Sequence, residues 1–180
     1  MTLKLFFYIA VLLIAIFGYR SYSSTSNKLK IGDDAPKFAL KDAQGNTHHL
    51  SDYAGSYLIL YFYPKDDTPS CTKEACNFRD DFTQLEKLHA KIIGISLDSA
   101  KSHAEFTNKH HLPFPLLTDT NAKVAESYHA LMDFYVFKIA KRHTFLINPA
   151  GKIEQIYRSV DSTKHSQQII DDLKRIQSSM

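Results

Sequence analysis

The chain has 180 residues, 44% of them hydrophobic, and a net charge of +3, which suits one globular domain with a short appendage. Acidic and basic residues alternate, and no basic stripe or RNA- or DNA-binding motif is present, so a nucleic-acid partner is excluded. Only two cysteines occur, which excludes a disulfide scaffold and a four-cysteine zinc site. The nine histidines show no metal-ligand spacing, so we expect no metal.

The N-terminal segment differs in composition from the rest of the chain. Residues 5–19 are uncharged and almost all apolar, and the residues after Arg20 are polar and rich in Ser and Thr. The length of this run lies between that of a signal-peptide core and that of a spanning helix, so both a cleaved signal and an uncleaved anchor are open. We favour the anchor, and divide the chain into an anchor or signal segment at 1–20, a polar tether at 21–28 and a folded domain at 29–180.

The sequence contains two opposing signals for the side of the membrane on which the domain lies. A signal-like start favours export, whereas Lys28 and Lys30 after the apolar run favour a cytoplasmic domain by the positive-inside rule. We expect anchoring through residues 5–19, with the domain on the extracytoplasmic (periplasmic) face.

The first half of the domain alternates strands and helices. Residues 38–40 and 47–50 flank a turn with glycine and predict a β-hairpin. The run YLILYFY at residues 57–63 has the length of a strand and is apolar throughout, which predicts a central strand buried on both faces. Residues 72–90 have apolar side chains three or four positions apart, which predicts an amphipathic helix. A second buried strand is predicted at residues 91–97.

In the second half, helices are predicted at residues 99–110, 121–129 and 161–177, and a short strand at residues 116–117. Residues 144–147 and 153–157 flank an Asn-Pro-Ala-Gly turn and predict a second hairpin. Strands that alternate with helices, followed by an antiparallel hairpin, predict an α/β fold with a central mixed sheet and helices on both faces.

The first cysteine lies where the central strand leads into the first helix. Pro64 ends the strand, Thr68 has the chemistry of a helix N-cap, and Pro69 suits the first helical position. Cys71 then falls in the first helical turn, where free backbone N–H groups and the helix dipole favour a thiolate. Thr68 can also direct its hydroxyl toward the sulfur or a substrate oxygen. Although a lone cysteine is commonly a small buried hydrophobe, this setting predicts a nucleophile.

Cys76 is five residues further along the same predicted helix. On an intact α-helix, two residues with this spacing have Cα atoms about 8.6 Å apart, whereas a disulfide rarely tolerates more than roughly 7 Å. A bond between Cys71 and Cys76 therefore requires the first turns of the helix to unwind. This favours a redox pair that alternates between two local structures over a permanent structural crosslink.

These residues resemble the peroxiredoxins and, within them, the bacterioferritin-comigratory-protein (PrxQ) class. The peroxiredoxin pattern P-x-x-x-T-x-x-C is met by Pro64, Thr68 and Cys71. Cys76 stands at the position of the second cysteine of the PrxQ class. The similarity covers nearly the whole domain, and one departure is Ser70, where the family usually has glycine.

The resemblance implies a thioredoxin-like fold and a thiol-dependent peroxidase that reduces hydrogen peroxide and organic hydroperoxides in antioxidant defence. Cys71 would be the peroxidatic cysteine, whose thiolate attacks the peroxide and becomes a sulfenic acid. Cys76 would be the resolving cysteine of an atypical 2-Cys enzyme, forming an intramolecular disulfide that thioredoxin or a thioredoxin-like reductant reduces. Arg142 would stabilise the thiolate and the peroxide oxygens, and Pro64 would shield the sulfur. No metal or organic cofactor is implied.

The expected partners are a hydroperoxide, a thioredoxin-like reductant and, through the N-terminal segment, a membrane. We expect a monomer, with a weak dimer as the alternative. A membrane-tethered thioredoxin-fold disulfide carrier or copper chaperone is a competing interpretation, but such proteins use CxxC or CxxxC spacing, unlike Cys71 and Cys76. A binding module with a structural disulfide is a third interpretation, which the helix geometry disfavours.

Overall fold

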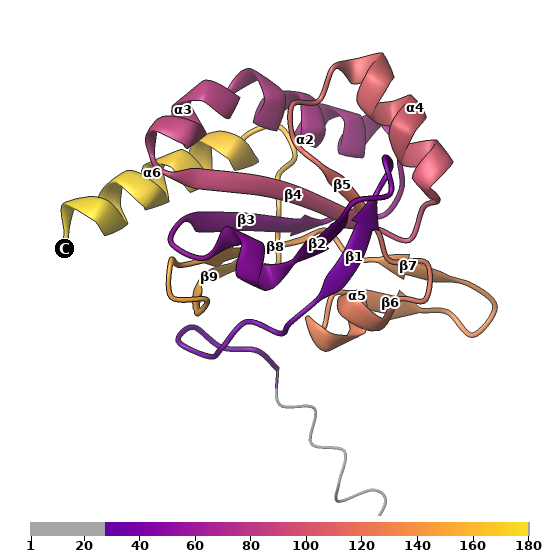
Figure 1. Ribbon diagram of the computed structural model, residues 1–180, viewed down its shortest axis with the longest axis horizontal. Coiled ribbons are helices and arrows are strands. Elements are labelled where there is room, and N and C mark those ends of the chain that lie inside the picture. The colour runs from indigo at the N-terminus through magenta and orange to yellow at the C-terminus, as the bar shows by residue number, and fades with distance from the viewer. Residues whose placement is uncertain (1–27, 180) are drawn as a thin grey trace, which may run out of the picture.

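The computed structural model describes residues 28–179. Its central feature is a seven-stranded mixed sheet with the strand order β2-β1-β5-β4-β3-β8-β9 (Figure 1). The strands of this sheet are β1 (Ala39–Asp42), β2 (Thr47–His49), β3 (Tyr57–Phe62), β4 (Ala90–Ser96), β5 (Leu116–Thr118), β8 (His143–Ile147) and β9 (Ile153–Tyr157). A 3-10 turn, η1 (Leu50–Tyr53), links β2 to β3.

The two faces of the sheet are covered unequally. Four helices pack over one face: α2 (Pro69–Asp80), α3 (Phe82–Lys87), α4 (Ala100–His110) and α6 (His165–Ser178). The opposite face bears three shorter elements: α5 (Lys123–Ser127) and the small hairpin of β6 (Leu131–Asp133) and β7 (Lys138–Ala140) (Figure 1). Helices therefore lie on both faces, as the α/β prediction requires.

Strand β3 is the centre of the molecule, and every one of its residues is buried. It pairs in parallel with β4 and antiparallel with β8. Because side chains alternate along a strand, β3 contributes to two hydrophobic cores, with Tyr61 on the side of α2 and Phe62 on the side of α5. The apolar run that predicted this strand is explained by burial on both faces.

Most predicted elements are confirmed to within a few residues, but two helices have different bounds. The helix predicted at 72–90 begins at Pro69 and is divided into α2 and α3 by Asp81, whose φ of −92° and ψ of 3° lie outside the helical region. The last helix begins at His165 instead of residue 161. The reason is that the Asp161 side chain accepts hydrogen bonds from the backbone and hydroxyl of Thr163, which forms a turn.

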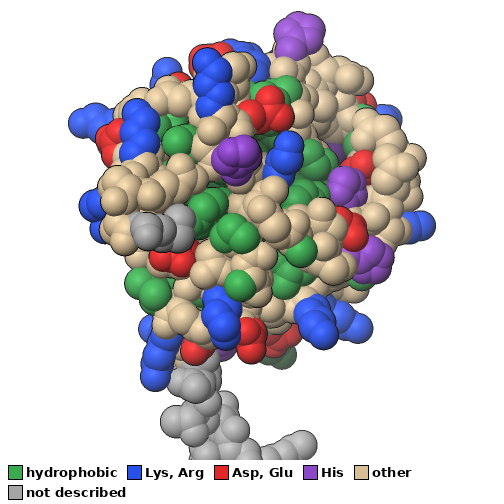
Figure 2. Space-filling model, turned by 60° about the vertical axis from the view of Figure 1, so that its left-hand side comes forward, with side chains coloured by type: hydrophobic (Ala, Val, Ile, Leu, Met, Phe, Trp, Pro, Cys, Tyr) green, Lys and Arg blue, Asp and Glu red, His purple; other side chains and the backbone are tan. Residues whose placement is uncertain are grey.

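The β6–β7 hairpin was not predicted. Its tip, Phe134 to Phe137, is a run of large exposed apolar residues, with Tyr135 fully exposed. Its strands have only three residues each, and the apolar run forms the turn between them, so the sequence shows neither a strand period nor a polar turn at this hairpin. Elsewhere the surface is mixed, and Figure 2 shows a face on which hydrophobic side chains lie among interspersed acidic and basic groups.

The predicted anchor at residues 5–19 lies outside the described residues, as does nearly all of the predicted tether at 21–28. Within residues 28–179, no helix has both the length and the apolar composition needed to cross a membrane.

Gly94 allows β4 to pack closely under Tyr61. A Cβ added at Gly94 would lie 2.7 Å from Leu116 and from the ring and hydroxyl of Tyr61. Because both neighbours are buried, we expect Gly94→Ala to lower the free energy of unfolding by about 1–3 kcal/mol, measured by urea denaturation. Lys91→Ala, at an exposed position of the same strand, is the control and should change little. An unchanged urea midpoint for Gly94→Ala would contradict this packing.

Candidate functional site

The candidate site lies at the C-terminal end of β3, where residues 64–68 lead into α2. Thr68 is the N-cap residue and Pro69 the first helical residue, so Cys71 occupies the first turn, as predicted. Its side chain is buried, with 2% of the residue exposed. The free backbone N–H groups and the dipole of this turn favour negative charge on the sulfur.

Arg142 is the cation that faces Cys71. Strand β8 runs antiparallel to β3 with His143 opposite Phe62, so residue 142 lies at the edge of the sheet where the chain leaves β3. There Nη2 of Arg142 donates a hydrogen bond of 3.2 Å to Sγ of Cys71. A guanidinium in this position stabilises the thiolate relative to the thiol.

Glu74 holds the other arm of the guanidinium. Its carboxylate accepts a hydrogen bond from Nη1 of Arg142, and only 1% of the residue is exposed. Burial raises the pKa of Glu74 to about 7, and the charge of Arg142 opposes that rise only in part. Sequence reasoning missed this residue, although its spacing of three from Cys71 places both on the same face of α2. Arg142 is thus positioned between a sulfur and a buried carboxyl group.

Thr68 occupies the predicted N-cap position, but its side chain does not cap the helix. Its hydroxyl instead donates a hydrogen bond of 3.1 Å to the carbonyl of Lys65. The N-cap prediction is therefore confirmed for the position and wrong for the side chain. Because the hydroxyl hydrogen is engaged by the loop, the lone pairs of the oxygen are the part available to a ligand. Pro64 is partly buried and is separated from β3 by Tyr63 alone.

Asp66 fastens the loop at residues 64–68 to the body of the domain. The hydroxyls of Tyr63 and Ser102 each donate a hydrogen bond of 2.7 Å to its carboxylate, and Nδ1 of His103 lies 2.9 Å from it. Burial raises the pKa of Asp66, but the hydrogen bonds from these partners outweigh that effect and hold it below its usual range. This network fixes the loop that precedes Cys71.

Cys76 lies further along α2 and is partly exposed, and both cysteines are free thiols. The helix is continuous from Pro69 to Asp80 and therefore includes both of them. The helical separation on which the prediction depended is thus present. A Cys71–Cys76 disulfide cannot form until part of α2 opens.

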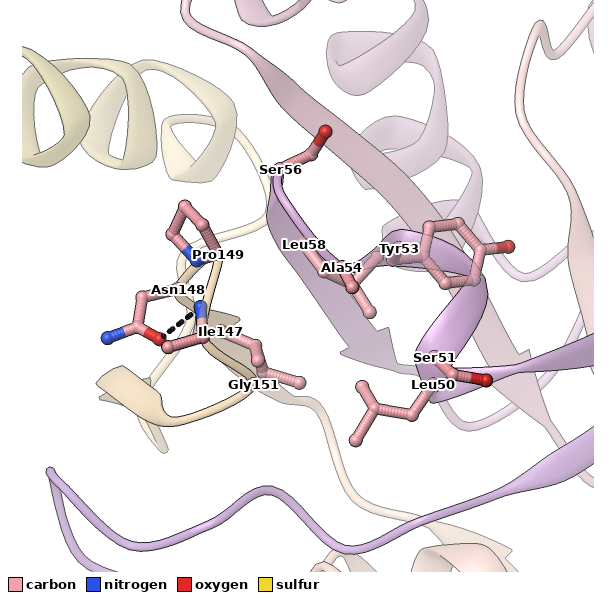
Figure 3. A pocket seen from close by; sticks show the side chains of 11 residues that line it. Leu50, Ser51, Tyr53, Ala54, Ser56, Leu58, Ile147, Asn148, Pro149 and Gly151 are labelled. Atoms are coloured by element: carbon pink, nitrogen blue, oxygen red, sulfur yellow. Dashed lines mark hydrogen bonds between the residues drawn. The ribbon is translucent and has the colours of Figure 1, made fainter.

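A separate hollow of about 190 Å³ lies at the opposite end of β3 (Figure 3). Leu58 and Ile147 in its wall are paired across β3 and β8, at the far end from Cys71. In the turn beside it, the side-chain oxygen of Asn148 accepts a hydrogen bond of 3.1 Å from the backbone of Ala150. Within the described chain, the residues that line this hollow include no Cys, His, Asp, Glu, Lys or Arg. The reactive groups are therefore at the other end of the sheet.

Comparison with known proteins identifies the family. The model of the AhpC/TSA family matches residues 31–156. Peroxiredoxin Bcp of Bacillus subtilis is 43% identical, covering 81% of this chain and 96% of the relative. The chain is a Bcp/PrxQ peroxiredoxin of the AhpC/TSA family. A putative peroxiredoxin Bcp of Coxiella burnetii is 42% identical over 81% of this chain and 99% of the relative.

Solved structures agree with this assignment. A cysteine-to-serine mutant of PrxQ from Xylella fastidiosa matches this peroxiredoxin with a TM-score of 0.79 and 32% identity, over 84% of this chain and 99% of that one. Peroxidoxin BcpB from Mycobacterium tuberculosis matches with a TM-score of 0.78 and 31% identity, over 82% of this chain and 98% of that one. The thioredoxin-like fold is confirmed, and the peroxiredoxin is a thiol-dependent peroxidase of the atypical 2-Cys type. The disulfide-carrier and copper-chaperone interpretation is not supported.

The predicted membrane-anchored, extracytoplasmic localisation is wrong. The Bacillus and Coxiella relatives are matched over 96% and 99% of their length, so the shared domain accounts for almost all of each. Residues 28–179 contain no helix that could cross a membrane. The prediction depended on residues 5–19 alone, a run whose length does not distinguish an anchor from other apolar segments.

Replacing Glu74 tests its role as a positioning residue for Arg142. We expect Glu74→Ala to slow the reaction of Cys71 with hydrogen peroxide roughly tenfold to a hundredfold, because Arg142 loses the acceptor that fixes its Nη1. The rate is measured by rapid quenching with dimedone, which traps sulfenic acid, followed by mass spectrometry.

Two controls distinguish positioning from a general loss of structure. Glu74→Gln keeps an oxygen that can accept from Nη1 and should recover part of the rate. In an Arg142→Lys background, Glu74→Ala should add little, because its effect is exerted through Arg142. Fully additive losses would show that Glu74 acts by another route.

Proposed function

We propose that Cys71 is the peroxidatic cysteine and Cys76 the resolving cysteine of this peroxidase, within a catalytic unit formed by residues 29–180. The 3.2 Å contact between Arg142 and Cys71 Sγ is the observation that supports this order. It provides one of the two sulfurs, at a helix N-terminus, with a partly buried cation. A thiol that must react first with peroxide needs this stabilisation of its thiolate.

In the first step, the Cys71 thiolate attacks one oxygen of the hydroperoxide and the O–O bond breaks. The departing oxygen takes a proton and leaves as water or alcohol, while the sulfur becomes a sulfenic acid. Arg142 stabilises the negative charge as it moves from the sulfur to the departing oxygen. Thr68, whose hydroxyl hydrogen is bonded to Lys65, accepts a hydrogen bond from the peroxide O–H. Pro64 limits the access of water to the sulfur.

In the second step, the first turns of α2 open and Cys76 attacks the sulfenic sulfur. Oxidation itself promotes this opening, because a neutral sulfenic acid interacts more weakly with Arg142 than a thiolate does. The contacts to be broken include the bond of 3.2 Å between the hydroxyls of Ser70 and Ser162 and the bonds of Cys71 and Glu74 to Arg142. The resulting disulfide is then reduced by thiol exchange with thioredoxin or a thioredoxin-like protein.

The substrates we propose are hydrogen peroxide and organic hydroperoxides, reduced by a monomer. The bacterioferritin comigratory protein of Xanthomonas campestris is described as having alkyl peroxide reduction activity. Its structure matches this chain with a TM-score of 0.71 and 33% identity, over 77% of this chain and 90% of that one. This likeness supports alkyl hydroperoxides as substrates.

The two serine variants test the order of the cysteines. Cys71→Ser should lose all peroxide turnover, because no second thiolate can replace it. Cys76→Ser should form one equivalent of sulfenic acid, seen by mass spectrometry after dimedone trapping, but should not turn over with thioredoxin. Peroxide turnover by Cys71→Ser at the wild-type rate would overturn the proposal.

Arg142→Lys tests the fork geometry of the guanidinium. A lysine keeps the charge but lacks the planar fork whose two separate nitrogens reach the sulfur and Glu74, so we expect the oxidation step to slow roughly tenfold or more, with resolution unchanged. Competition for hydrogen peroxide against a second peroxidase measures this rate. Arg175→Lys, at an exposed ion pair on α6, is the matched control. Equal oxidation rates in both variants would exclude Arg142 from the site.

A further inference from the structure

Cys76 is the first member of a row of three side chains that come from separate segments. Its Sγ lies 3.9 Å from Nδ1 of His110, at the last position of α4. On the other side of the same ring, Nε2 of His110 lies 3.1 Å from a carboxylate oxygen of Asp67, in the loop before α2. A thiol, an imidazole and a carboxylate are thus arranged in sequence.

The chemistry of Asp67 determines which nitrogen of His110 has the hydrogen. Hydrogen bonds from Lys109 and His110 lower the pKa of Asp67, so the group is ionised at neutral pH. An ionised carboxylate can only accept hydrogen bonds, so Nε2 of His110 must donate. In the neutral ring, Nδ1 is then the acceptor, and its lone pair is directed to the thiol of Cys76. This is the arrangement of a general base held in its working tautomer by a carboxylate.

The other groups around His110 hold it in place and favour charge separation. Nζ of Lys109 lies 2.9 Å from the same Asp67 oxygen. Arg79, on α2, donates a hydrogen bond of 2.8 Å to the His110 carbonyl. The ring of Phe106 packs edge-on at 5.0 Å. In the described chain the charged or titratable groups around His110 are therefore Asp67, Lys109, Cys76, and Arg79 with its partner Asp80.

We propose that His110 is the general base of the resolution step and that Asp67 is its positioning residue. This inference rests on the proposed role of Cys76 as the resolving cysteine. His110 takes the proton of the Cys76 thiol at Nδ1 and leaves a thiolate. The thiolate attacks the sulfur of the Cys71 sulfenic acid, the S–S bond forms and the S–O bond breaks. The departing hydroxide takes the proton from His110, so one water is released and no outside oxidant or reductant is required.

The position of the base also fits the opening of α2. Arg79 lies beyond Cys76 along the helix, and its bond to the His110 carbonyl joins α4 to a part of α2 that need not unwind. The proton can therefore leave Cys76 while the helix is closed. The resolving sulfur is then already a thiolate when the first turns open, which shortens the life of the sulfenic acid and limits its further oxidation.

The test compares His110→Asn with His111→Asn, a matched change at the neighbouring, exposed histidine. Because the chain has no tryptophan, the thiol, sulfenic and disulfide forms are followed by rapid quenching and mass spectrometry. We expect His110→Asn to form sulfenic acid at the wild-type rate but the disulfide about tenfold or more slowly at pH 7, since an unassisted thiol is only a few per cent ionised there. The deficit should close at alkaline pH, where hydroxide ionises the thiol directly.

Two further measurements separate a base from a structural residue. Free imidazole should restore disulfide formation in His110→Ala. Asp67→Asn, which suits the φ of 56° at that position, should move the pH profile of disulfide formation toward alkaline pH, by a smaller amount than His110→Asn does.

The outcomes distinguish this inference from the function on which it rests. Disulfide formation in His110→Asn with the rate and pH profile of His111→Asn overturns the role of His110, as does equal slowing of both steps. If Cys76→Ser accumulates no sulfenic acid, the resolving role of Cys76 fails instead, whatever His110 does.

Discussion

The pairing of β3 with both β4 and β8 is the constraint on which the site depends. Burial of β3 on both faces fixes its C-terminal end, and the register of His143 opposite Phe62 brings Arg142 to that end. The sulfur of Cys71 reaches the same place because the loop after β3 is short and held by Asp66. A slip of one residue in β8 would turn every side chain of that strand to the other face and remove the guanidinium from the sulfur.

The first turn of α2 serves two opposed requirements. A closed helix offers its N–H groups and dipole to the Cys71 thiolate, but the same closed helix keeps Cys76 too far away for a disulfide. In the mechanism we propose, the two requirements are met at different times, because oxidation of Cys71 removes the negative charge that the closed helix stabilises. Opening this turn would expose Cys71 and Glu74, which are 2% and 1% exposed, and would break the bonds of both to Arg142. The contacts that position the sulfur are thus the ones that keep the helix closed.

The sequence pattern was most informative where burial is uniform or alternates. The strands β3 and β4 and the closing hairpin lie where apolar runs and turn residues predicted them, and the two cysteines lie on one helix. It failed for the β6–β7 hairpin, whose exposed Phe134 and Phe137 stack on each other without a strand period. It also misled at residues 5–19, where hydrophobicity alone was interpreted as a membrane location.

The sequence by itself determined the family, the place of Cys71 in the first turn of a helix and its geometric conflict with Cys76, because these depend on residues close together in the chain. Only the tertiary structure decided which side chains surround those sulfurs. Arg142 reaches Cys71 through strand register, and His110 reaches Cys76 because α4 ends beside α2. Glu74 lies between these two cases. The sequence shows its spacing of three from Cys71 on the helix, but it does not show that Glu74 is buried against Arg142. Contacts between distant segments depend on packing in three dimensions, which a local pattern does not encode.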